Sequence, residues 1–224
     1  MKKLEIYWQC RESHERFKVG ELFKDKSKYI FKYVDNVQKF EDNGFRPIFP
    51  FLDYTKKYSS QSIFPCFKNR LPDAKRKDID SILKKYDLEE YDDFELLSKS
   101  EGRLPTDRLE FINPIDPLKK SFTHDFYIAG VSHGFFCNKE LCDYTENIKL
   151  GYELNLVREK NNPFDKYAVR IDYKERKLGY IPKYYSEAVS KLIEENKKIR
   201  CIVFRVKSGT VDCRECIKAR LIVE

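Results

Sequence analysis

The chain has 224 residues, of which 36% are charged, 41% are hydrophobic and 15% are aromatic, and its net charge is +7. This composition excludes a disordered chain, the length allows one large domain or two small ones, and the charge permits nucleic acid as a partner without requiring it. No apolar run approaches the roughly 18 residues of a membrane span, and the N-terminus lacks the apolar core of a signal peptide, so we expect a cytoplasmic protein without a membrane partner.

The first half of the sequence predicts a small antiparallel sheet followed by helices. Residues 28–34 (KYIFKYV) are aromatic and β-branched, which is typical of a strand. Farther along, a turn that contains Pro72 and Asp73 can begin a helix with one apolar stripe. We expect strands at 4–9, 18–23 and 28–34, and helices at 74–86 and 92–100, the second capped by Asp92 or Asp93 and stopped by Gly102.

A polar segment with two prolines, Pro114 and Pro117, separates two halves of different character. We therefore predict a first domain over 1–112, a linker over 113–124 and a second domain over 125–224. The second half predicts strands at 125–131, 148–157, 167–171, 177–182, 201–206 and 217–223, and one helix at 184–196. The fold class is α+β, and a small barrel with a helix is the natural closure because it removes exposed strand edges.

The cysteines and histidines give weak support to a metal site or to covalent catalysis. Seven cysteines and no secretory signal argue against a disulfide framework. Cys213 and Cys216, with Cys137 and Cys142, could offer four thiolates to zinc, but only one pair has the usual spacing. No Cys/His pair has a nearby acid at a nucleophile spacing, and the acidic run at 87–95 reads as a solvated helix start. We expect reduced cysteines, no metal, no cofactor and no enzymatic activity.

The motif at 158–169 (REKNNPFDKYAV) is the most informative feature of the second half. Asn162 and Pro163 form a turn that would display Phe164 and Asp165 beside Arg158. This turn would bring together an aromatic ring, a carboxylate and a guanidinium, a combination that suits a nucleotide. The base can stack on the ring, a sugar hydroxyl can bond to Asp165 and a phosphate can bond to Arg158. The alternative is that the motif only caps a β-turn, with Phe164 in the core.

At these residues the sequence resembles the HIRAN domain family. The resemblance covers 126–224 and includes FYIAGV at 126–131, Arg158 with Glu159, NPFD at 162–165, and KLGYIP at 177–182. It implies an OB-like β-barrel that binds single-stranded DNA, in the best-understood members by a free 3′ end. By the resemblance, Phe164 would stack on a terminal base, Asp165 would accept from the 3′-hydroxyl, and His133 occupies a further aromatic position of the family. Tyr is frequent at the position of Phe164, so Phe and His preserve stacking here but lose phenolic hydrogen bonds.

Residues 1–112 resemble the N-terminal subdomain of HipA-family kinase toxins. The matching pieces are VGEL at 19–22, YIFKY at 29–33, FKNRLPD at 67–73, FELL at 94–97 and GRLPTDRLEF at 102–111. In that family this subdomain does not hold the phosphotransfer residues, and the sequence has neither a Walker loop nor a His-Arg-Asp catalytic loop. The resemblance implies a Ser/Thr kinase of the HipA family as a partner, and the aromatics from Phe45 to Phe67 are candidate contacts unless they fill the domain's own core.

Three functions compete on this sequence. The first is a non-catalytic, antitoxin-like regulator whose N-terminal half binds or restrains a HipA-like kinase toxin and whose C-terminal half binds single-stranded DNA. The second is a DNA-end-binding accessory module in repair or phage defence, without a kinase partner. The third, a nuclease or hydrolase, is disfavoured because no clustered set of carboxylates is evident.

Overall fold

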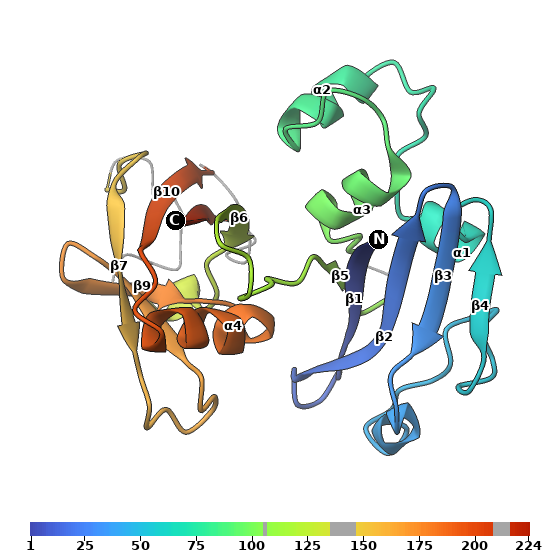
Figure 1. Ribbon diagram of the computed structural model, residues 1–224, viewed down its shortest axis with the longest axis horizontal. Coiled ribbons are helices and arrows are strands. Elements are labelled where there is room, and N and C mark those ends of the chain that lie inside the picture. The colour runs from blue at the N-terminus through green and yellow to red at the C-terminus, as the bar shows by residue number, and fades with distance from the viewer. Residues whose placement is uncertain (105–106, 135–146, 208–215) are drawn as a thin grey trace. The chain divides into compact units, whose positions relative to one another are not determined.

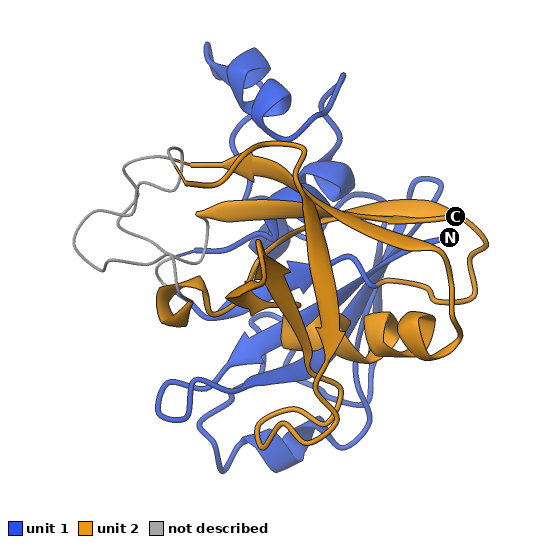
Figure 2. Cartoon of the chain, turned by 90° about the vertical axis from the view of Figure 1, so that its left-hand side faces the viewer, with its two compact units in different colours: residues 1–114 blue, residues 115–224 orange. Residues whose placement is uncertain are grey.

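The computed structural model describes residues 1–104, 107–134, 147–207 and 216–224. The chain divides into two compact units, residues 1–114 and residues 115–224, which Figure 2 colours separately. Strand β6 (Phe122–Tyr127) begins inside the expected linker over 113–124, so the last three residues of that segment belong to the second unit's sheet. None of the helices in the described parts of the chain is long and apolar enough to cross a membrane.

A five-stranded antiparallel sheet forms the first unit, with the strand order β4-β3-β2-β1-β5 (Figure 1). Every second residue of β3 is buried, namely Tyr29, Phe31 and Tyr33, which is the alternation of a strand with one face on the core. The three expected strands are present, whereas β4 and β5 were not foreseen. The strands are β1 (Lys2–Gln9), β2 (Arg16–Asp25), β3 (Lys28–Tyr33), β4 (Lys57–Ser60) and β5 (Leu109–Ile112).

Short helices complete the first unit. The Asp92 carboxylate caps α3, because it accepts hydrogen bonds from the backbone N–H groups of Phe94 and Glu95 at 2.9 and 3.0 Å, as predicted. Glu101 and Gly102, both with positive φ, end this helix. The other expected helix covers only 79–85. The helices are η1 (Val37–Phe40), α1 (Pro65–Lys68), α2 (Ile79–Lys85) and α3 (Asp93–Ser100).

Aromatic side chains dominate the core of the first unit. The ring of Phe31 lies 4.5 Å from that of Phe51 and 5.6 Å from that of Phe67, and such pairs stabilise beyond the area that they bury. Most of the aromatics between Phe45 and Phe67 therefore fill the domain's own core. The buried members of that stretch are Phe45, Phe51, Phe64 and Phe67.

The second unit contains a six-stranded antiparallel sheet with the order β6-β11-β10-β7-β8-β9. Helix α4 (Lys183–Glu194) buries Tyr185, Val189 and Leu192, and these spacings place the three side chains on one helical face. The mixed α+β fold is as predicted. The remaining elements are η2 (Val131–His133), β7 (Glu153–Arg158), β8 (Val169–Tyr173), β9 (Arg176–Tyr180), β10 (Ile199–Val206) and β11 (Ile217–Val223).

The expected closed barrel is not found in the described residues of the second unit. Strand β7 changes partner along its length, since Leu154 pairs with β10 and Asn155 begins the pairing with β8. The outer strands β6 and β9 do not pair as a ladder. A single antiparallel bridge joins Ala129, just after β6, to Tyr180 at the end of β9, with hydrogen bonds of 2.9 and 2.8 Å. The sheet is therefore strongly bent and linked across its opening at one point.

Candidate nucleic-acid interface

The loop between β7 and β8 is built on the side chain of Asn162. Its amide oxygen accepts hydrogen bonds from the backbone N–H groups of Phe164, at 3.0 Å, and Asp165, at 3.2 Å. Its amide nitrogen donates to the Glu159 carboxylate at 3.0 Å. This is an Asx turn, the local structure that the Asn-Pro pair predicts. Asn162 thus shapes the loop with both ends of its amide.

Arg158 fastens the same loop to helix α4. Its guanidinium donates to the carbonyl oxygens of Ala168, at 3.1 Å, and Lys166, at 2.6 Å, and to the Ser190 hydroxyl at 2.5 Å. Only 12% of the side chain is exposed. The guanidinium is therefore committed to internal acceptors, and the structure does not present it beside Phe164 as a free phosphate ligand.

Phe164 and Asp165 lie at the tip of this fastened loop. The Phe164 residue is 86% exposed, so the interpretation that placed it in the core is wrong. One oxygen of the Asp165 carboxylate accepts a hydrogen bond from the backbone N–H of Tyr167 at 2.8 Å, and its other oxygen accepts no hydrogen bond from any described residue. The tip therefore offers an open aromatic face next to a carboxylate oriented by the backbone.

A polar cluster supports the base of the loop. Glu159 accepts hydrogen bonds from Asn162, from Arg170 at 2.9 Å and from the Tyr180 hydroxyl at 3.2 Å. Burial disfavours the charged form of Glu159, but these three donors outweigh burial and lower its pKa. Arg170 also forms a bidentate pair with the buried carboxylate of Asp172. Charge-assisted hydrogen bonds thus stabilise the base of the loop.

Tyr180 connects this loop to the segment that carries His133. Its backbone bonds to Ala129, and its ring lies beside Gly130, which has a φ of 68° and directly precedes η2. The close approach needs glycine at position 179, because a Cβ atom there would lie 2.5 Å from the Ala129 carbonyl oxygen. His133 is exposed at the end of η2. Tyr180 was not among the predicted site residues, although it belongs to the motif at 177–182.

Lysines flank the aromatic residues of this region. The ammonium group of Lys177 lies 4.5 Å from the centre of the Tyr180 ring, and that of Lys166 lies 4.7 Å from the centre of the Tyr167 ring. Lys160 and Lys166 are exposed on the loop itself. Lysine side chains next to aromatic rings suit a phosphodiester chain and its bases.

The cysteine hypothesis falls mostly outside the described residues. Cys137, Cys142 and Cys213 lie there, and Cys216 is buried. Burial also raises the pKa of the Cys201 thiol to about 12, which keeps it protonated. Zinc binding by Cys137, Cys142, Cys213 and Cys216 therefore stays a hypothesis.

Both halves match known protein families. Residues 121–224 match the model of the HIRAN domain, and residues 13–105 match the model of the HipA N-terminal domain. These matches confirm both resemblances seen in the sequence.

Two solved structures are similar to part of the chain. The crystal structure of the HIRAN domain of human HLTF is 14% identical, with 46% of this chain and 78% of that chain covered and a TM-score of 0.36. The crystal structure of a protein from Lactobacillus plantarum is 18% identical, with 46% and 96% covered and a TM-score of 0.35. No curated protein matches the chain significantly.

Proposed function

From a chain that carries a HIRAN domain (residues 121–224) preceded by a HipA N-terminal domain (residues 13–105), we infer a DNA-binding regulatory protein without catalysis of its own. The HIRAN domain supplies DNA binding. We propose further that it binds single-stranded DNA at the 3′ end, and that the first unit binds a HipA-family kinase in the manner of an antitoxin.

The observation that carries the DNA proposal is the exposure of Phe164 on a rigidly fastened loop. A large aromatic side chain that is 86% exposed gains nothing from folding and is available to stack on a base. The Asn162 turn and the Arg158 contacts fix its backbone, so little ordering is needed on binding. In this account Phe164 stacks on the terminal base, and the open Asp165 oxygen accepts from the 3′-hydroxyl.

The remaining predicted residues take different roles in the proposal. Arg158 and Asn162 hold the loop and do not touch DNA. The exposed lysines Lys160 and Lys166 replace Arg158 as phosphate contacts, and the exposed His133, at the end of η2, offers a second stacking surface.

A titration at fixed salt tests this function. Short single strands labelled at the 5′ end carry either a 3′-hydroxyl or a 3′-phosphate, and a duplex of the same sequence serves as a third probe. A 3′-phosphate removes the hydroxyl donor and places negative charge beside Asp165, so we expect roughly tenfold weaker binding than to the 3′-hydroxyl strand. Equal affinities for the two single strands would refute the end-specific role.

The kinase proposal rests on the loop that contains Phe49 and Leu52, which are 77% and 65% exposed. The buried Tyr33 hydroxyl anchors this loop, because it donates to the Phe51 carbonyl oxygen at 2.8 Å and accepts from the Ile48 N–H at 2.7 Å. Two apolar side chains held in solvent by buried hydrogen bonds are suited to insert into a partner's pocket.

Co-purification with a HipA-family kinase from the same organism tests the partner. We expect a complex that survives gel filtration at micromolar concentrations and that Phe49→Asp disrupts. If the wild-type proteins separate cleanly while 3′-end binding persists, the protein is instead a DNA-end-binding accessory module in repair or phage defence.

A further inference from the structure

The first unit contains a cavity of about 520 Å³ that is distinct from the DNA-binding loop. Its size falls within the range of small-molecule sites, roughly 300–1,000 Å³. Pairing of β1 with β5 sets Trp8 opposite Leu109 in its wall. Gly44, Arg46 and Phe49 are exposed, so the cavity opens to solvent on their side. Its apolar surface comes from Trp8, Phe45, Ile48, Phe49 and Leu109.

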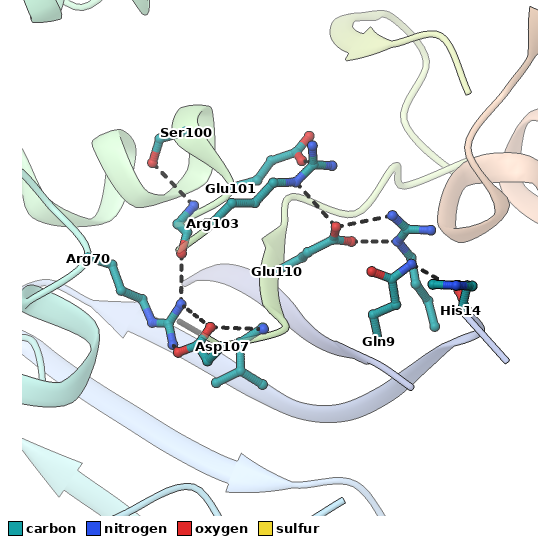
Figure 3. A network of polar contacts seen from close by, with 11 residues as sticks. Gln9, His14, Arg70, Ser100, Glu101, Arg103, Asp107 and Glu110 are labelled. Atoms are coloured by element: carbon teal, nitrogen blue, oxygen red, sulfur yellow. Dashed lines mark hydrogen bonds and ion pairs between the residues drawn. The ribbon is translucent and has the colours of Figure 1, made fainter. Parts of the chain in front are cut away.

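The cavity is also basic. Four arginines line it, whereas Asp107 is the one carboxylate among its described lining residues. Asp107 is already neutralised, because it forms a bidentate ion pair with Arg70 (Figure 3). Arg70 also donates to the Gly102 carbonyl oxygen at 2.8 Å, and only 4% of its side chain is exposed. This pair is a structural part of the wall and leaves the positive charge of the other three arginines uncompensated.

Those three guanidinium groups, on Arg11, Arg46 and Arg108, form no ion pair with any described residue. Arg46 donates to the carbonyl oxygens of Phe45, at 2.7 Å, and Glu41, at 3.1 Å. Arg108 contacts the Cys10 carbonyl oxygen at 3.4 Å. Carbonyl oxygens orient the guanidinium groups of Arg46 and Arg108 without cancelling their charge, so both keep donors for an anion, and the exposed Arg11 adds a third positive charge.

We propose that this cavity binds a free mononucleotide, an aromatic ring system that carries a phosphate monoester. The phosphate pairs with the guanidinium groups of Arg11, Arg46 and Arg108, because a guanidinium can bind phosphate oxygens through two parallel hydrogen bonds and a phosphate monoester carries enough negative charge to engage several arginines. The base packs between Trp8 and Phe49, since stacking on aromatic side chains is favourable for every base. The site lies in the first unit and does not depend on DNA binding by the second.

Trp8 provides a direct readout because it is the single tryptophan of the chain and lines the cavity. The full-length protein is titrated with AMP, adenosine and inorganic phosphate while tryptophan fluorescence is recorded, with calorimetry as a second measurement. We expect saturable quenching by AMP, and at least about tenfold weaker binding of adenosine and of phosphate, each of which lacks half of the recognised chemistry.

Two exposed lining residues allow variants that leave folding intact. Arg46→Gln and Phe49→Ala should each weaken AMP binding by about tenfold, whereas Arg76→Gln, at an exposed arginine that does not line the cavity, should leave it unchanged. Absence of saturable AMP binding, equal binding of adenosine or phosphate, or full binding by Arg46→Gln would each overturn the proposal. Binding of a 5′-phosphorylated DNA strand but not of AMP would also overturn it.

Discussion

Arg158 and Phe164 belong to one motif but lie in opposite environments. Both residue types commonly bind nucleic acid, and the motif alone predicted that the two side chains contact one nucleotide. In the structure the guanidinium of Arg158 is used by the carbonyl oxygens of Lys166 and Ala168, while Phe164 is left in solvent. Arg158 therefore organises the loop, whereas Phe164 is the side chain that the loop exposes. A substitution of Arg158 should change both stability and DNA affinity, and a substitution of Phe164 should change DNA affinity alone.

Replacing Phe164 with Ala should weaken binding of single-stranded DNA by roughly 1–3 kcal/mol, the usual contribution of one stacked base. The free energy of unfolding should not change, because the ring is 86% exposed. Anisotropy titrations and denaturant melts measure the two quantities. Phe49→Ala is a matched control, since it removes a phenylalanine of similar exposure from the other unit, and it should leave DNA affinity unchanged. Loss of affinity in both variants would point to a non-specific effect.

Glu159 predicts a pH dependence of stability. Hydrogen bonds from Asn162, Arg170 and Tyr180 lower its pKa in the folded state against the opposing effect of burial. A carboxylate of this kind stabilises the fold above its unfolded pKa of about 4.3, and the contribution is lost as the pH falls through the folded value. Wild type should therefore exceed Glu159→Gln in unfolding free energy at neutral pH, and the gap should narrow below about pH 4. A gap that is constant with pH would contradict this assignment.

At the scale of elements, the β7–β8 loop is held between helix α4 and strand β9. Ser190 of α4 accepts from Arg158, and Tyr180 at the end of β9 donates to Glu159. The hydrophobic stripe of α4 accordingly includes buried Ser190, a polar residue that the amphipathic pattern alone would not place inside. The loop's shape is thus set by two elements that are distant in sequence.

Arg158→Lys separates the two roles that can be given to Arg158. Lysine keeps the charge but cannot reach two carbonyl oxygens and a hydroxyl at once. We expect a loss of about 1–3 kcal/mol in unfolding free energy, together with weaker DNA binding, because the loop that displays Phe164 is loosened. Ser190→Ala should act in the same direction with a smaller effect. Unchanged stability and unchanged affinity in Arg158→Lys would instead favour a simple phosphate contact.

Local patterns in the sequence predicted local structure well. The Asp92 cap of α3 and the Asn162 turn both follow from side chains that bond to backbone within a few residues. The bridge from Ala129 to Tyr180 could not be foreseen, because it depends on how the whole sheet bends. The burial of Arg158 was missed for the same reason, since its acceptor Ser190 lies on a distant helix. Exposure of Phe164 likewise depends on tertiary structure, and the motif left it undecided.

At the scale of the whole molecule, a different function is proposed for each of the two compact units. The first, residues 1–114, holds the aromatic core, the exposed loop with Phe49 and the basic cavity, while the second, residues 115–224, holds the DNA-binding loop. Among the described residues, each of the two sheets is built from strands of one unit. We therefore propose that each unit folds by itself.

Expression of residues 115–224 alone tests this division. The fragment should give a cooperative unfolding transition and bind the 3′-hydroxyl strand with the affinity of the full chain, because every residue assigned to DNA binding lies within it. The fragment 1–114 should not bind that strand. A large loss of affinity in the fragment 115–224 would show that the first unit contributes to DNA binding, contrary to the proposed separation.

The central claim is that Asp165 reads the free 3′-hydroxyl next to a base stacked on Phe164. The most direct test is the ratio of affinities for 3′-hydroxyl and 3′-phosphate strands, measured at one salt concentration for wild type and for Asp165→Asn. Asparagine keeps an acceptor for the Tyr167 N–H but removes the charge that repels a phosphate. The account predicts a ratio of roughly ten for wild type that falls towards one in Asp165→Asn. The same ratio in both proteins would contradict it.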